Sequence, residues 1–244
     1  MHPSPALVPA QRLTRPRPRR RVQVVRAVSV LVVVAALAGR CSDRLEPLPD
    51  RPTFYEDGSY SFLSTQTYDA GVPVTWDHCR PIEVVLNPYD APPGAEALVR
   101  DALRDLEQVS AFRFAWGGLR SQRPAPGRRT GPVLVSFSTA DETTRMTEGV
   151  AGLGGSSWSE LEGTRAWFRT GEVTLSASYF ALLHDRGETG LMRAVVLHEL
   201  GHVLGLDHVA STEEIMNGEA GGTLQLGHGD LTGLAKLGSQ PCRT

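Results

Sequence analysis

Cysteine is scarce in this sequence: only three cysteines occur among 244 residues, and none lies near the histidine-rich stretch at residues 198–208. A structural zinc site is closed by four protein ligands, usually with cysteines among them, so we do not expect one at these histidines. The chain also has no internal repeat, and no apolar run reaches the roughly 20 residues of a membrane-spanning helix. One domain of ordinary size with a well-buried core is the default for this length.

Acidic residues are absent from the first 38 residues, which hold seven of the 25 basic residues. The rest of the chain holds the other 18 basic residues and all 27 acidic ones, so its net charge is about −9. Because this part of the chain is so acidic, we do not expect nucleic acid as a partner. The basic block is interpreted as part of a targeting signal.

That basic block precedes the uncharged segment AVSVLVVVAALAG, Ala27–Gly39, which contains the small-residue pattern Ala36-Leu37-Ala38. A basic region, a short apolar stretch and small residues are typical of a secretory signal peptide. An uncleaved signal anchor over residues 22–39 is the alternative, because three valines extend the apolar character upstream. In both cases the body of the protein is expected outside the cytoplasm, secreted or held at the membrane by this anchor alone.

Three regions are expected: a signal peptide or anchor at 1–40, a stalk or lead-in at 41–75, and one domain at 76–244. Cys79 and Cys242 bracket this domain, and an exported protein meets oxidising conditions. Their pairing would close a loop of about 160 residues and contribute on the order of 5 kcal/mol in the chain-entropy model. We expect this disulfide, which leaves Cys41 as the odd cysteine.

Beyond Cys79 the hydrophobic pattern alternates between period two, typical of strands, and helical spacing. The expected strands are Ile82–Pro88, Phe112–Trp116, Val133–Ser138, Gly152–Ser159 and Glu172–Ala177, and the expected helices are Gly94–Ala111, Gly190–Gly205 and Gly229–Gly238. The glycine-rich run at 152–159 is expected at an exposed sheet edge. This order predicts an α+β (mixed α/β) fold with helices packed on a mixed sheet.

The segment HELGHVLGLDH carries the residues that point to chemistry. His198 and His202 are four residues apart, so on a helix they project from one side and can both reach one zinc ion at about 2.0–2.1 Å. Gly205 can end the helix in a left-handed conformation, which lets the chain turn and present His208. Three protein ligands leave the fourth zinc position open, as in catalytic sites. Glu199 is then placed to act as general base.

The pattern H-E-x-x-H-x-x-G-x-x-H, with Met216 eight residues after its last histidine, resembles the metzincin metalloproteases, named for a methionine turn beneath the zinc. With WDHCRPIEVVLNP, AGLGGSSW and GDLTGLAKLG, it is similar to a matrixin-like group of exported bacterial metalloproteases over most of residues 60–242. The resemblance implies a twisted mixed sheet, a backing helix, an active-site helix and a C-terminal helix. It also implies a substrate peptide antiparallel to the edge strand within Gly152–Ser159.

Some positions depart from this family. Val209 stands where animal matrixins usually have serine, and Asn217-Gly218-Glu219 replaces Pro-x-Tyr after the methionine. The cysteine-switch motif is missing. Cys79 could cap the zinc as an inhibitory thiolate, but no pro-domain would hold it there, so the disulfide is expected. One catalytic Zn²⁺ is the expected cofactor, whereas a calcium site is not recognisable.

The expected function is therefore a monomeric zinc endopeptidase that cuts extracellular or cell-surface proteins. Zinc lowers the pKa of bound water towards about 7, and Glu199 takes that proton and passes it to the leaving amine. Two alternatives stay open: a non-catalytic surface-binding domain that keeps zinc for stability, and a zinc amidase that cuts a cell-wall crosslink.

Overall fold

The computed structural model describes residues 21–24, 59–124, 130–143, 145–147, 149–160, 164–219 and 223–243. The expected signal segment and most of the expected stalk, with Cys41, lie outside these residues, apart from a short strand, β1 (Arg21–Val24). None of the described helices combines the length and the apolar character needed to cross a membrane.

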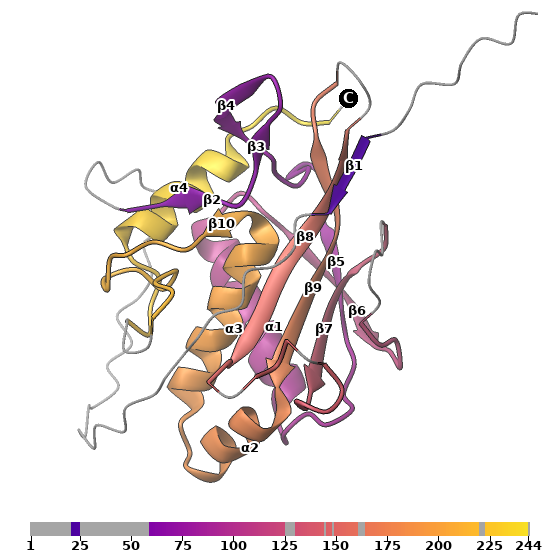
Figure 1. The fold of residues 1–244 in the computed structure, drawn as a ribbon, viewed down its shortest axis with the longest axis vertical. Coiled ribbons are helices and arrows are strands. Elements are labelled where there is room, and N and C mark those ends of the chain that lie inside the picture. Colours follow the sequence, from indigo (N-terminus) through magenta and orange to yellow (C-terminus); the bar gives the residue numbers. More distant parts are fainter. Residues whose placement is uncertain are drawn as a thin grey trace, which may run out of the picture.

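A mixed sheet of six strands, in the order β1-β8-β9-β7-β5-β6, forms one layer of the domain (Figure 1). Besides β1 its strands are β5 (Ile82–Leu86), β6 (Phe114–Leu119), β7 (Val133–Ser138), β8 (Gly152–Glu160) and β9 (Trp167–Ser176). Strands β6, β5, β7 and β9 are neighbours in that order and pair in parallel. In contrast, β8 pairs antiparallel with β9, and β1 antiparallel with β8. The predicted mixed sheet is confirmed.

The helices gather on one side of this sheet (Figure 1). They are α1 (Ala95–Val109), α2 (Ala177–Asp185), α3 (Thr189–Leu204) and α4 (His228–Gly238). The crossover that two parallel strands require is made between β5 and β6 by α1, which buries Leu98, Ala102 and Leu106 at the predicted spacing. Every residue from 194 to 204 of α3 is buried, because α3 packs on β8 and β9 of the sheet and is also in contact with α1, α2 and β10.

All eight predicted elements are present, but some bounds differ. Strand β6 runs from Phe114 to Leu119, whereas Phe112–Trp116 was predicted. Strand β9 begins at Trp167, five residues before the predicted start, and ends at Ser176. There a helix that the sequence analysis missed begins: the Ser176 hydroxyl accepts a hydrogen bond from the Tyr179 amide (3.4 Å) and caps α2. A serine at the N-cap satisfies an amide that the first helical turn leaves without a partner.

Residues 59–75, which fall within the expected lead-in, pack on the domain. Strand β2 (Ser61–Phe62) pairs with β10 (Leu206–Asp207), and β3 (Thr65–Gln66) pairs with β4 (Asp69–Pro73). The buried Gln66 side chain donates to the carbonyl of Ala166 (3.1 Å) and accepts from its amide (2.8 Å). The segment is therefore part of the folded unit.

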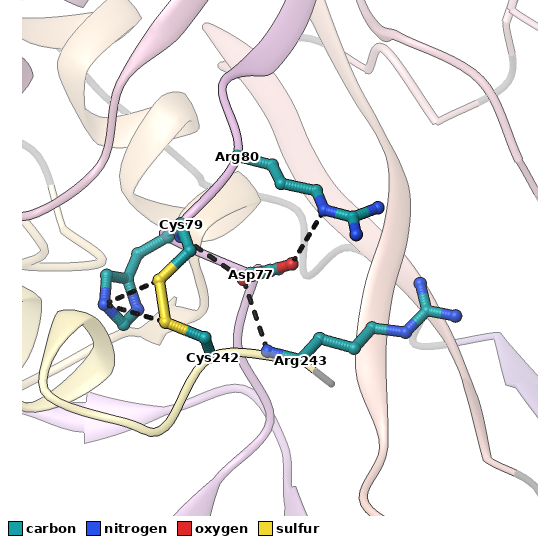
Figure 2. Close-up of a disulfide and its surroundings, with 6 residues drawn as sticks. Asp77, Cys79, Arg80, Cys242 and Arg243 are labelled. Carbon is teal, nitrogen blue, oxygen red and sulfur yellow. Dashed lines mark hydrogen bonds and ion pairs between the residues drawn. A yellow bond between two sulfur atoms is a disulfide. The ribbon is translucent and has the colours of Figure 1, made fainter.

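The expected disulfide joins Cys79 to Cys242, with 5.8 Å between their Cα atoms (Figure 2). It ties the segment that leads into β5 to the chain beyond α4. Because Cys79 is bonded in this way, its sulfur is not a ligand for a metal at the three histidines.

Candidate metal centre

Helix α3, which carries His198 and His202, ends at Gly205 as the sequence predicts. At Gly205 the backbone has φ = 121°, which glycine adopts without strain. A Cβ there would lie 3.0 Å from the Phe168 ring and 3.2 Å from Leu237, so the position also lacks room for a side chain. The Gly205 carbonyl accepts from the Leu63 amide (2.9 Å), and the chain then turns into β10. This turn brings His208 back to the helix.

Three imidazoles converge at this turn. Nε2 of His208 lies 3.1 Å from Nε2 of His198 and 3.0 Å from Nε2 of His202. A tetrahedral zinc ion with nitrogen ligands at about 2.0–2.1 Å would hold such atoms roughly 3.3 Å apart. The two histidines on the helix are buried, and His208 is partly exposed. The spacing of the three nitrogens therefore fits a shared zinc ion.

The hydrogen bonds of the rings explain why a cation belongs between them. Nδ1 of His198 lies 2.6 Å from the Ile215 carbonyl oxygen, and Nδ1 of His202 lies 2.9 Å from that of Leu206. A carbonyl oxygen only accepts, so each Nδ1 carries the proton and each Nε2 presents a lone pair. Lone pairs that face one another repel, whereas a metal ion binds them together.

Burial keeps these rings neutral, which metal binding requires. The pKa of His198 is held well below its usual value by burial, with a smaller contribution from the neighbouring His202. Burial likewise lowers the pKa of His202 to about 3 and that of His208 below its usual value. At neutral pH all three imidazoles are thus ready to bind a cation without first losing a proton.

Glu199 lies beside this centre and is almost completely enclosed, with 1% of its surface exposed. Among the described residues, neither carboxylate oxygen has a partner in hydrogen-bonding geometry. Burial raises the pKa of Glu199 to about 8, although the nearby Gly154 amide, which is outside hydrogen-bonding geometry, offsets part of the rise. A carboxylate so placed, without a fixed partner, can exchange a proton with a molecule bound at the centre.

Strand β8 encloses Glu199 by means of two glycines on the same face of the strand. A Cβ at Gly152 would lie 2.7 Å from Oε1 of Glu199, and one at Gly154 would collide with the Glu199 backbone carbonyl. Only glycine lets the strand approach α3 so closely. The sequence analysis expected an exposed edge strand here. That expectation is wrong in part, because most of β8 is buried and β1 lies outside it at Ser157–Glu160; the contact with Glu199 was not predicted.

Met216, the residue for which the resemblance implies a methionine turn, packs against α3 at Gly201, next to His202 in the chain. It is 1% exposed, and a Cβ at Gly201 would lie 2.5 Å from its sulfur, so the missing side chain at Gly201 makes room for the thioether. The Met216 carbonyl accepts from the Val209 amide (3.1 Å), which fixes the turn to the segment that carries His208.

A buried carboxylate that the sequence analysis did not single out holds the turn at Met216 by hydrogen bonds. Asp230, in the first turn of α4, accepts from the amides of Ile215 (2.6 Å), Met216 (3.3 Å) and Gly227 (2.8 Å). Since the Ile215 carbonyl accepts from His198, Asp230 orients that imidazole through one peptide unit. The signal that could have found Asp230 is an acidic residue in the first turn of the last helix.

The last turn of α3 is held by two side chains from other elements. The carbonyl oxygen of Val203 accepts from Nε1 of Trp76 (2.8 Å) and from Oγ of Ser156 on β8 (2.7 Å). A carbonyl near a helix end has no partner within the helix. These two donors supply one and fix the helix end against the sheet.

Part of the outer edge of β8 next to Glu199 has no partner strand among the described residues, although residues 152–156 are themselves buried. There β1 pairs only with Ser157–Glu160, and none of the described strands pairs with that edge at residues 152–156. Backbone amides and carbonyls on such an edge can pair with an extended peptide.

Comparison with known proteins gives one family. Residues 133–237 match the family model of the matrixins, Peptidase M10. The matched segment begins with β7 and ends within α4, so it includes the three histidines, Glu199 and Met216. A search of curated proteins finds no match to the chain.

Proposed function

We propose that this chain, whose residues 133–237 match the matrixin family model, is a zinc-dependent endopeptidase of the metzincin type with Glu199 as its general base. The observation that carries this proposal is the convergence of three imidazole Nε2 atoms beside a buried carboxylate that has no partner of its own among the described residues. The family match supports zinc-dependent peptide hydrolysis in general, and the specific roles follow from this geometry.

His198, His202 and His208 would hold the ion. Bound there, zinc supplies a Lewis acid that polarises a substrate carbonyl and acidifies water. A cation beside Glu199 favours the charged carboxylate, so the carboxyl group, whose pKa burial raises to about 8, becomes an ionised base. Glu199 then accepts a proton from the attacking water and delivers it to the leaving amine.

The substrate we propose is an extended peptide. Main-chain hydrogen bonds to the outer edge of β8 at residues 152–156 would align it beside Glu199. Such pairing involves only backbone groups of the substrate, so it suits protein substrates of varied sequence.

We further propose that the domain acts outside the cytoplasm, on extracellular or cell-surface proteins, after export through the signal segment at 1–40. The support is the basic block and the uncharged segment after it. A mature chain that starts after residue 40 would lack β1, and the β8 edge at Ser157–Glu160 would lose its partner strand. Mass spectrometry of the exported protein would identify its first residue: a start within 1–24 contradicts cleavage.

The decisive experiment measures hydrolysis of casein and of a peptide library by the purified protein and by Glu199→Gln. We expect the protein to cut peptides until a chelator removes the metal, and to recover when zinc returns. Glu199→Gln should bind the same zinc yet lose hydrolysis. Cleavage that survives the chelator, or full activity in Glu199→Gln, would refute the mechanism, and zinc binding without peptide cleavage would favour a binding domain or an amidase.

A further inference from the structure

A second group of metal-binding side chains lies at the disulfide, away from the three histidines. One ligand atom from each of His78, Cys79 and Cys242 falls within 4.8 Å of the other two. Nε2 of His78 lies 3.6 Å from Sγ of Cys79 and 4.0 Å from Sγ of Cys242, so the imidazole faces both sulfurs. Its other ring nitrogen, Nδ1, is buried, which leaves Nε2 as the nitrogen available to a ligand.

The two cysteines are held together by more than their covalent bond. Oδ1 of Asp77 accepts from the Cys79 amide (3.2 Å) and from the Arg243 amide (3.4 Å), next to Cys242 in the chain (Figure 2). Its other oxygen pairs with Arg80 (3.5 Å). None of these contacts uses sulfur. After reduction, Asp77 would still hold the C-terminal segment beside Cys79, so the three ligand atoms would stay close together.

We propose that the reduced protein binds a thiophilic divalent cation such as Zn²⁺ through His78, Cys79 and Cys242, and that the cation then replaces the disulfide as the link between the two segments. This site is distinct from the all-histidine centre and is independent of the peptidase activity.

The chemistry balances with a dithiol as reductant. The dithiol supplies two electrons and two protons to the sulfur–sulfur bond, becomes a disulfide itself, and leaves two cysteine thiols. Both cysteines are exposed, so the reductant can reach them. When the cation binds, each thiol releases its proton to solvent, because the thiolate is the ligand. Two thiolates and an imidazole suit zinc, and water can complete its four positions.

The test uses Co²⁺, since thiolate ligands give cobalt a sulfur-to-metal charge-transfer absorption that imidazoles do not give. The full chain carries Cys41→Ser, which removes the third thiol, and is reduced with a phosphine, which takes up oxygen from water and becomes the phosphine oxide. We expect one cobalt equivalent per oxidised chain and two per reduced chain, with the charge-transfer band only in the reduced protein.

The variant His78→Ala separates the site from adventitious binding by thiols. It keeps the disulfide, so oxidised His78→Ala should match the oxidised parent in thermal stability. Reduced His78→Ala should bind the second cobalt at least about tenfold more weakly, and Zn²⁺ should raise the unfolding temperature of the reduced parent much more than that of this variant. The control is His184→Ala, which removes an exposed histidine on α2 and should behave like the parent.

A reduced parent with one cobalt equivalent and no charge-transfer band would overturn the proposal. Equal second-site affinity in the parent and in His78→Ala would also overturn it, because the two thiolates alone would then bind the metal.

Discussion

Replacing Gly152 by alanine should damage catalysis and leave metal binding intact. The new Cβ would lie 2.7 Å from Oε1 of Glu199, whereas ordinary contact begins at 3.4 Å, so the carboxylate must move by the difference of about 0.7 Å. A displacement of about 1 Å in a catalytic group can cost on the order of 10²-fold in rate. We therefore expect kcat to fall by roughly 10²-fold, with KM and zinc affinity changed by no more than a few-fold.

The assay is steady-state hydrolysis of a fluorogenic peptide, with zinc content and thermal unfolding measured on the same samples. Gly190→Ala in α3 is the matched control, because its Cβ would make only an ordinary contact, 3.7 Å from Leu224, so its kcat should match the parent. A Gly152→Ala enzyme with unchanged kcat would refute the reasoning that β8 positions Glu199. A variant that lost zinc together with activity would show that the glycine supports the metal centre instead.

Three further predictions concern stability. Trp76→Phe and Ser156→Ala should each lower the free energy of unfolding by about 1 kcal/mol, since each removes one donor to the Val203 carbonyl. The double variant should lose more than the sum, because a buried carbonyl without any donor costs roughly 1–3 kcal/mol. Additive losses, measured by urea unfolding, would contradict this. Burial raises the pKa of Asp230 from 3.8 to about 7, so the folded state keeps a proton that the unfolded state loses, and this group's contribution to stability falls as pH rises from about 4 to about 7. The difference in unfolding free energy between the protein and Asp230→Asn should shrink over that range, and a difference independent of pH would contradict the shift. Under oxidising conditions, Cys242→Ser should lose up to about 5 kcal/mol, since the disulfide closes a chain separation of 163 residues; a loss under roughly 1 kcal/mol would show that Asp77 alone holds the two segments.

The metal centre could be predicted from the sequence because its geometry is local. Two histidines four residues apart share a helix face in any α-helix, and a glycine three residues after the second allows the turn that brings back His208. The family resemblance added the place of Met216. All of these residues lie within 19 positions of one another in the chain, so no distant contact had to be known.

The residues that orient the centre could not be predicted in this way, because they act across distant elements. Gly152 reaches Glu199 only because β8 packs on α3, and Asp230 reaches the methionine turn only because α4 packs beneath it. The same holds for the short strands of residues 61–73, which are too brief to give a hydrophobic period and are ordered by contacts such as that of Gln66 with Ala166.

X-ray absorption at the zinc edge, on the oxidised protein loaded with one zinc equivalent, tests the central claim most directly. Three imidazoles and one water predict three nitrogen neighbours and one oxygen neighbour at about 2.0–2.1 Å, without sulfur. His208→Ala should lose one nitrogen from this shell. A shell that contains sulfur near 2.3 Å, or one that His208→Ala leaves unchanged, would contradict the assignment of His198, His202 and His208 as the ligands of the catalytic metal.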